Sequence, residues 1–311
     1  MLLSLLQTEP YQIPWGDLAL DYVGFLAYFA MFGALGFFFV VLRGMSPHLV
    51  TTTGREASTI AGISAAAERA GARIGLVGAI LFLGDLLVNI AATAADKQIG
   101  FLDAIQRGGS RLMSPLVFGA LLLLSFLMAM RLVRAGWIAA LVAGLALALR
   151  SITTGKWASL VNPVHELSAS VWLGTLLVLV IAGLPAILRS QLPSERRGAL
   201  VAELVARFSP LALCAASLLG ITGVITAWRH LKFVAALWTT SYGYALDLKL
   251  IVVGIVLSLG AWNWRRMSPR LGSEGAAHQL RRSAKAELAF AAVVLAITAV
   301  LVSLPSPKLP H

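Results

Sequence analysis

Charged residues are scarce in this chain, and so is cysteine. Only 13% of the 311 residues are charged and 59% are hydrophobic, whereas a soluble domain is about one quarter charged. This composition excludes an ordinary soluble globular enzyme and predicts a protein that crosses a membrane several times. The one cysteine, Cys214, lies in an apolar stretch. An internal disulfide and a cysteine-rich metal site are therefore excluded.

Motifs for nucleotide binding and for common catalytic centres are also missing. The chain has no Gly-rich phosphate-binding loop, no nucleophile elbow and no HExxH pair of histidines. Direct use of ATP is therefore not expected, and we expect the chain not to be an enzyme. Methionine is sparse as well. Met128 and Met130 are two residues apart, so they point to different helix faces and form no thioether path for a soft metal ion.

The apolar residues fall into long runs that are separated by short polar stretches. Helices satisfy their own backbone hydrogen bonds inside a bilayer, and about 20 apolar residues span its hydrocarbon core. The sequence therefore predicts an all-α polytopic membrane helical bundle, a single membrane domain over residues 1–311 that is surrounded by the lipid bilayer. The eight predicted transmembrane spans are 17–42, 74–94, 114–133, 136–150, 163–185, 207–230, 243–263 and 286–304.

Positive charges are distributed unevenly between the two sides of this bundle. With the N-terminus outside, the inner connections hold 16 Lys and Arg residues and the outer segments hold 9, and none precedes Arg43. Because Lys and Arg gather on the cytoplasmic side, both termini are predicted to lie outside. The net charge of +11 then reflects membrane orientation, and no nucleic-acid partner is expected. The longest inner connection, 43–73, has room for a short surface helix.

Tryptophans near the span ends are expected to form aromatic belts at the two membrane surfaces. They are Trp15, Trp137, Trp157, Trp238, Trp262 and Trp264.

An ionisable side chain opens the fifth span. Of the five histidines, His165 is the one placed inside a hydrophobic span, where ionisable groups are costly and usually serve a ligand, a pathway or a relay. His165, Ser168 and Trp172 share one helix face, since seven residues make nearly two turns. A neutral imidazole on this face can bind a metal ion, with Trp172 closing the site from below. The structural alternative is that His165 caps the helix or bonds to a neighbouring carbonyl group.

Other polar residues are predicted at the same outer level of the bundle. They are Glu166 on the fifth span, His230 at the end of the sixth, and Tyr242, Asp247 and Lys249 at the start of the seventh. His230 and Glu166 are therefore candidate metal-binding partners of His165. The alternatives are that His230 contacts lipid headgroups and that Lys249 snorkels outward. Asp247 and Lys249 are two residues apart, so each needs another partner.

A carboxylate is predicted near the middle of the membrane. Asp85 and Asn89 are four residues apart on the second span and face the same way. A carboxylate at this depth costs at least about 2.5 kcal/mol, so Asp85 is expected to be protonated, paired or in contact with water. A place on a transport path and a purely structural role both fit.

Three stretches of the second half resemble the bacterial copper resistance D family of multi-helix inner-membrane proteins. The first runs from His165 to Trp172-Leu173-Gly174. The second is Arg207-Phe208-Ser209 at the start of a helix that ends at Gly223 to Ala227-Trp228. The third is Trp238-Thr239-Thr240-Ser241-Tyr242-Gly243 followed by Leu246-Asp247-Leu248-Lys249. The family-like core covers about 160–265.

This resemblance implies a multi-pass protein of the bacterial plasma (inner) membrane that handles copper. Copper ions would be taken from the periplasmic side for import into the cytoplasm, with a periplasmic copper-binding protein as a possible partner. His165 would be the first metal ligand, with His230 and Glu166 as further ligands. Asp85 and Asn89 would lie on the path, and Tyr242, Asp247 and Lys249 would shape the outer mouth. The chain departs from its relatives where Lys156 follows Gly155, since the family often has a second histidine there.

Two other functions remain open from the sequence. One is a haem-binding membrane redox protein, for which His165 and His230 are the candidate axial pair. The other is a membrane assembly subunit that delivers copper to a partner enzyme. An assembly subunit needs no path through the membrane, so Asp85→Leu would be harmless in it.

Overall fold

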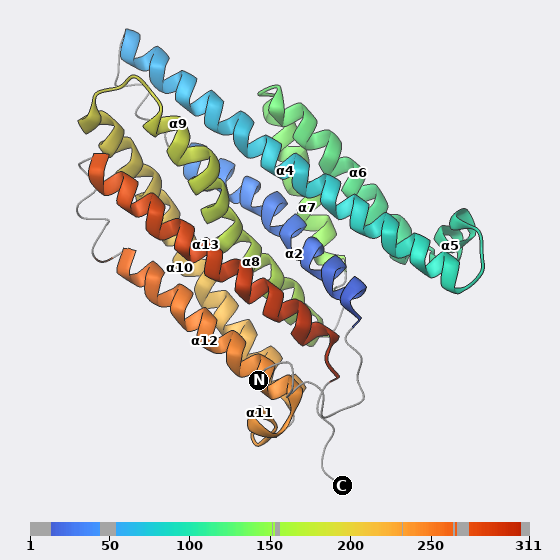
Figure 1. The fold of residues 1–311 in the computed structure, drawn as a ribbon. Helices are drawn as coiled ribbons and strands as arrows, with labels where there is room; N and C mark the ends of the chain where they lie inside the picture. Colours follow the sequence, from blue (N-terminus) through green and yellow to red (C-terminus); the bar gives the residue numbers. More distant parts are fainter. Residues whose placement is uncertain are drawn as a thin grey trace.

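The computed structural model describes residues 14–43, 54–150, 152, 156–231, 233–263, 265 and 274–305. Within these ranges every regular element is helical, which confirms the predicted all-α bundle (Figure 1). The elements are α2 (Trp15–Gly36), η1 (Phe37–Leu42), α4 (Arg55–Asp96), α5 (Phe101–Gly108), α6 (Ser110–Met130), α7 (Arg134–Leu149), η3 (Trp157–Leu160), α8 (Val161–Val178), η4 (Leu179–Gly183), α9 (Leu184–Leu188), α10 (Ser194–Leu231), α11 (Ala236–Thr239), α12 (Ser241–Trp262) and α13 (Glu274–Ser303).

Seven helical segments in the described part of the chain are long and apolar enough to cross a membrane. The fourth of the eight predicted spans, 136–150, is present but short. It forms α7, an apolar helix of 16 residues, whose length is about 24 Å. That is shorter than the hydrocarbon core of about 30 Å. The bundle is therefore polytopic as predicted, with seven full-length spans and one short helix.

The second span is much longer than predicted. Residues 55–73, expected to belong to a connection, continue the helix, so α4 runs over 42 residues and about 63 Å. Alanine-rich sequence favours this continuation, and Ile60, Ile63 and Ala67 bury one face of it. At its tip Glu56 forms an ion pair of 2.6 Å with Arg196 at the start of α10.

The two ends of the bundle can be followed in Figure 1. The start of α2 and the end of α13 lie at the same end, together with the short helices α5 and α11. We call this the outer end, because the Lys and Arg distribution predicts that it faces outward, and the opposite end, with the tips of α4 and α10, the inner end. The structure thus places the first and last described helix ends on one side.

Helix α2 lies at the centre and crosses α8 at two glycines. A Cβ atom built on Gly174 would lie 2.9 Å from the Cα of Gly33 and still closer to the carbonyl oxygen of Phe29. The two backbones are therefore in direct contact. Small residues allow such close approach between membrane helices.

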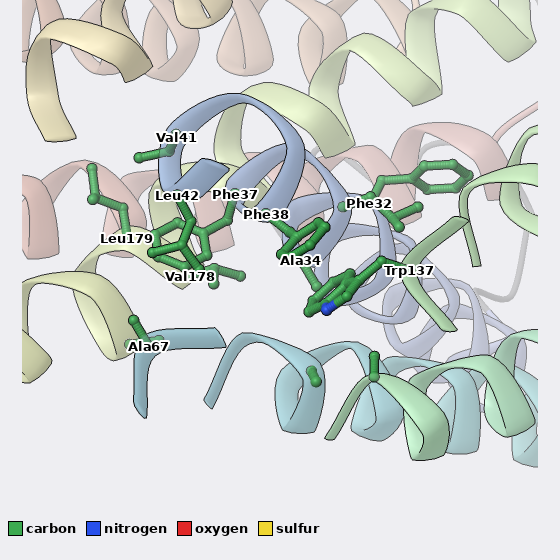
Figure 2. Packing of buried hydrophobic residues seen from close by; sticks show 14 of the residues in the cluster. Phe32, Ala34, Phe37, Phe38, Val41, Leu42, Ala67, Trp137, Val178 and Leu179 are labelled. Carbon is green, nitrogen blue, oxygen red and sulfur yellow. The ribbon is translucent and has the colours of Figure 1, made fainter. Parts of the chain in front are cut away.

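The main apolar cluster joins α2, η1, α4, α6, α7 and α8, and Figure 2 shows part of it from close by. Its centre is Trp137, whose ring stacks on Phe38 at 4.2 Å and whose Nε1–H donates to Glu68 Oε1 at 2.9 Å. The prediction that Trp137 belongs to an interfacial belt is wrong, because this side chain is 0% exposed. Trp15, Trp238 and Trp262 are exposed as expected. Trp264 and the side chain of Trp157 lie outside the described residues.

Candidate functional site

His165 lies on α8 and points at α10. Its Nδ1 is 3.1 Å from Thr222 Oγ1. A Cβ atom built on the next residue, Gly223, would lie 3.2 Å from His165 Cε1. Glycine at position 223 therefore leaves room for the imidazole ring, which explains one of the glycines in the second stretch of the family resemblance.

The contacts of Thr222 determine which ring nitrogen of His165 carries the proton. The Thr222 hydroxyl donates to the carbonyl oxygen of Leu218 at 2.7 Å and is 3.2 Å from that of Leu219. A hydroxyl has one proton to donate, so towards His165 it acts as acceptor and Nδ1 is the donor. In the neutral ring this leaves Nε2 as the nitrogen with the free lone pair.

This arrangement is the one that metal-binding histidines use. Their second ring nitrogen almost always donates to a neighbouring acceptor, which holds the ring in place and leaves the other nitrogen for the metal ion. Here Thr222 is the acceptor, and the ring also has a hydrogen bond to the backbone of Leu219 on the same helix as Thr222. His165 therefore has the chemistry of a preorganised imidazole ligand.

Lys249 on α12 is a charged group that acts on this histidine. Its ammonium group interacts with the His165 ring, although the two residues are 84 positions apart in the sequence. Asp247, two residues earlier on α12, is half-buried. The structure therefore brings Lys249 to His165, and this part of α12 carries both a positive side chain, Lys249, and a negative one, Asp247.

His230 and Glu166 do not meet His165. His230 Nδ1 lies 2.9 Å from the carbonyl oxygen of Thr226, and its ring stacks on Tyr242 at 6.1 Å. It follows Thr222 by eight residues, or about 12 Å along α10. Glu166 interacts electrostatically with Arg150 at the end of α7 and with Tyr28 on α2.

Within the described residues no three His, Cys, Asp or Glu side chains come together to hold a metal ion. The expected convergence of His165, His230 and Glu166 is therefore not seen. Adjacent positions on a helix differ by about 100°, which is why His165 and Glu166 face different neighbours. Their assignment as metal ligands stays a prediction.

Trp172 forms an apolar layer below His165. It is two turns further along α8, or about 10.5 Å. Its side chain is buried among Phe29 of α2, Val256 of α12 and Leu295 of α13. This layer separates the outer level of the bundle from its inner half.

Asp85 and Asn89 form a polar group between α4 and α2. Asn89 Nδ2 donates to Asp85 Oδ1 at 3.2 Å and to the Asp85 carbonyl oxygen at 3.0 Å. The second carboxylate oxygen of Asp85 would be 3.8 Å from a Cβ atom on Gly24, and Asp85 interacts electrostatically with Asp21. Asp85 is therefore paired with an amide group through hydrogen bonds, and a paired carboxylate is one of the states predicted for it. It lies on the other side of α2 from the His165 site.

The third stretch of the family resemblance builds the turn that starts α12. The Thr240 hydroxyl accepts a hydrogen bond of 3.0 Å from the backbone N–H of Gly243 and so caps the helix. A Cβ atom on Gly243 would lie 2.6 Å from the carbonyl carbon of Leu237 and closer still to the oxygen of Ala236. Only glycine fits there, so this stretch fixes the start of α12 and thereby positions Tyr242 and Lys249.

Two polar residues that the sequence analysis missed are buried together. Asn263 at the end of α12 is 7% exposed, Glu287 on α13 is 5% exposed, and Asn263 Nδ2 donates to Glu287 Oε1. Glu287 lies inside the predicted span 286–304, so the criterion that selected Asp85 could have found it. Thr222 was also missed, because its role depends on how α8 and α10 align.

Comparisons with known proteins confirm the family resemblance. Residues 202–301 match the family described as copper resistance protein D. The chain is also 33% identical over 153 residues to the copper transport protein CutJ of Bacillus subtilis (strain 168). That alignment covers 49% of this chain and 26% of the relative, so the chain spans about a quarter of the relative's length. No solved structure matches the chain.

The family match does not coincide with the core predicted over 160–265. It begins within α10, after His165, and extends through most of α13. Thr222, Lys249, Asn263 and Glu287 therefore lie within the matched segment, whereas His165 lies before it.

Proposed function

We propose that this multi-pass membrane protein takes copper ions from the outer side of a bacterial plasma (inner) membrane and passes them toward the cytoplasm. His165 is the first protein ligand for the ion. Copper here is the transported substrate rather than a resident cofactor, and no catalytic role is proposed. A periplasmic copper-binding protein is the partner that we expect to deliver the ion.

The observation that carries this proposal is the contact between His165 Nδ1 and the Thr222 hydroxyl. With that hydroxyl donating to Leu218 within α10, we infer that Nδ1 carries the proton and that Nε2 presents a lone pair at the outer level of the bundle. Imidazole nitrogen is a suitable ligand for copper. The match to copper resistance protein D and the similarity to a protein named as a copper transporter support copper as the ion.

The alternative with an axial histidine pair for haem has less support from the geometry. Two axial histidines must face one iron from opposite sides. His165 lies at the level of Thr222, and His230 lies about 12 Å further along α10 with its ring against Tyr242. We therefore propose copper handling and not haem binding for these residues.

The first test is copper content, measured by mass spectrometry on detergent-purified full-length protein after copper loading. Wild type is expected to bind near-stoichiometric copper and His165→Ala to lose it. Thr222→Val keeps the side-chain shape but removes the acceptor for Nδ1, and should weaken copper binding by about 10–100-fold. Thr298→Val is the matched control, because the Thr298 hydroxyl bonds within α13 to the carbonyl oxygen of Val294.

Equal copper content in wild type and His165→Ala would overturn the proposed ligand. Direction is tested separately with proteoliposomes that are loaded from the outer side. Copper should accumulate inside with the wild type and remain outside with His165→Ala. Copper that binds but never enters would contradict transport and favour a delivery role.

A further inference from the structure

The buried pair Asn263 and Glu287 lies in the inner half of the bundle, away from His165. Asn263 caps α12, and Glu287 is 13 residues into α13. Both side chains are more than nine-tenths buried. A Cβ atom on Gly260, one turn before Asn263, would lie 3.7 Å from Glu287 Oε2. The Glu287 carboxyl group therefore lies against α12 at the level of Gly260.

No cation neutralises this carboxyl group within the described part of the chain. Its neighbours on α13, Ala284 and Leu288, pack in an apolar cluster with Leu176 of α8, Val180 of η4 and Phe208 of α10. On α10 the nearest charges, Glu203 and Arg207, are paired with each other at 2.8 Å. On α13 itself, Lys285 is exposed, and the half-buried Arg281 lies six residues before Glu287, which is about 9 Å along the helix and on a different face. An ionised carboxylate buried without a cation is costly, so a neutral carboxylic acid is the form that this environment favours.

The hydrogen bonding points to the same form. Asn263 Nδ2 donates to Glu287 Oε1, while Asn263 Oδ1 is buried and has no hydrogen-bond partner. Buried polar atoms are nearly always paired. A protonated carboxyl group has one O–H donor. It can donate to Asn263 Oδ1 while its other oxygen accepts from Nδ2, which gives a closed pair of hydrogen bonds. A proton on Glu287 therefore satisfies the one unpaired atom of the pair.

We propose that Glu287 and Asn263 form a proton-binding site in the inner half of the bundle, and that this proton exchanges with water. The ligand is one proton, held on the Glu287 carboxyl group and accepted by the Asn263 amide oxygen. The site is independent of whether His165 binds copper. It gives the protein a second place, inside the membrane, where positive charge can be taken up and released.

The experiment is infrared spectroscopy of the detergent-purified full-length protein at neutral pH. The carbonyl stretching band of a protonated carboxyl group is separate from the bands of carboxylates. Glu287→Gln should remove one such band from the wild-type spectrum. Glu203→Gln is the matched control, because Glu203 is ion-paired with Arg207 and its loss should leave this band unchanged. Transfer into heavy water should shift the band, since O–H becomes O–D.

Asn263→Ala provides a second readout that keeps the carboxyl group. It removes the donor to the carboxyl oxygen, so the same band should remain and move to higher frequency. An identical protonated-carboxyl region in wild type and Glu287→Gln would overturn the proton site. A Glu287 band that never shifts in heavy water would overturn the exchange. Both results are independent of copper content, so they can be told apart from failure of the His165 proposal.

Discussion

The close contact between α2 and α8 at their crossing leads to a prediction about the thermal stability of the protein. Gly174→Ala adds a single methyl group, but it adds it where the two backbones touch. The new Cβ atom would lie 2.9 Å from Gly33 Cα, whereas carbon atoms pack at about 3.5–4.0 Å. The helices must therefore separate by at least about 0.6 Å. The contact with the Phe29 carbonyl oxygen requires more.

The expected cost follows from what overpacking does in other cores. Forcing an extra methyl group into a well-packed site costs about 1–3 kcal/mol. For a chain of this size each kcal/mol corresponds to a melting shift of about 2 °C. Gly174→Ala is therefore expected to lower the melting temperature of the detergent-solubilised protein by about 2–6 °C. Gly33→Ala should do the same, because it addresses the same contact from the other helix.

The control is Gly84→Ala on α4. Among the described residues no heavy atom lies within 4 Å of a Cβ atom built on Gly84. Alanine is also the better helix former by about 1 kcal/mol. Melting of this variant should therefore equal or exceed that of wild type. If Gly174→Ala melted together with Gly84→Ala, the backbone contact at the crossing would not exist as described.

Two further substitutions test other contacts. Trp137→Phe keeps a ring against Phe38 but leaves the Glu68 carboxyl group without its hydrogen-bond donor. We expect this change to lower the free energy of unfolding by about 1–3 kcal/mol, seen as a lower melting temperature. A melting temperature unchanged from wild type would show that the hydrogen bond contributes nothing. Gly243→Ala places a methyl group against the carbonyl groups of the turn before α12 and should reduce stability by a similar amount. Gly254→Ala on the same helix should not reduce stability, because no heavy atom among the described residues lies within 4 Å of a Cβ atom built there. Equal melting of these two glycine variants would refute the tight turn.

Much of the fold was readable from composition and hydropathy. The long apolar runs predicted the helices and most of their ends, but α10 and α13 begin 13 and 12 residues before the predicted spans 207–230 and 286–304. The errors have physical reasons. Residues 55–73 look like a polar connection by hydropathy, but alanine continues the helix there without apolar side chains. Trp137 lies near a span end in the sequence, yet the short helix α7 carries it into the core.

The site was readable only in part, because its contacts depend on how helices align. His165 stood out as an ionisable residue in an apolar span, but its partner Thr222 is 57 positions away. The glycines of the family-like stretches show the same limit. Gly174 serves a helix crossing, Gly223 makes room for an imidazole and Gly243 fits a helix cap. The sequence marked these glycines as parts of the family-like stretches, but it did not show that each glycine has a different structural role.

The inner tips of α4 and α10 have a practical consequence for imaging. From Arg55 to Glu68, helix α4 extends about 20 Å beyond the level of Trp137, and the Glu56–Arg196 ion pair ties it to α10. Small membrane proteins are hard to align in electron cryomicroscopy, because the detergent micelle hides their features. The joined tips of α4 and α10 give a conformation-specific antibody fragment one defined epitope made from two helices, by which particles can be oriented without a fused marker protein.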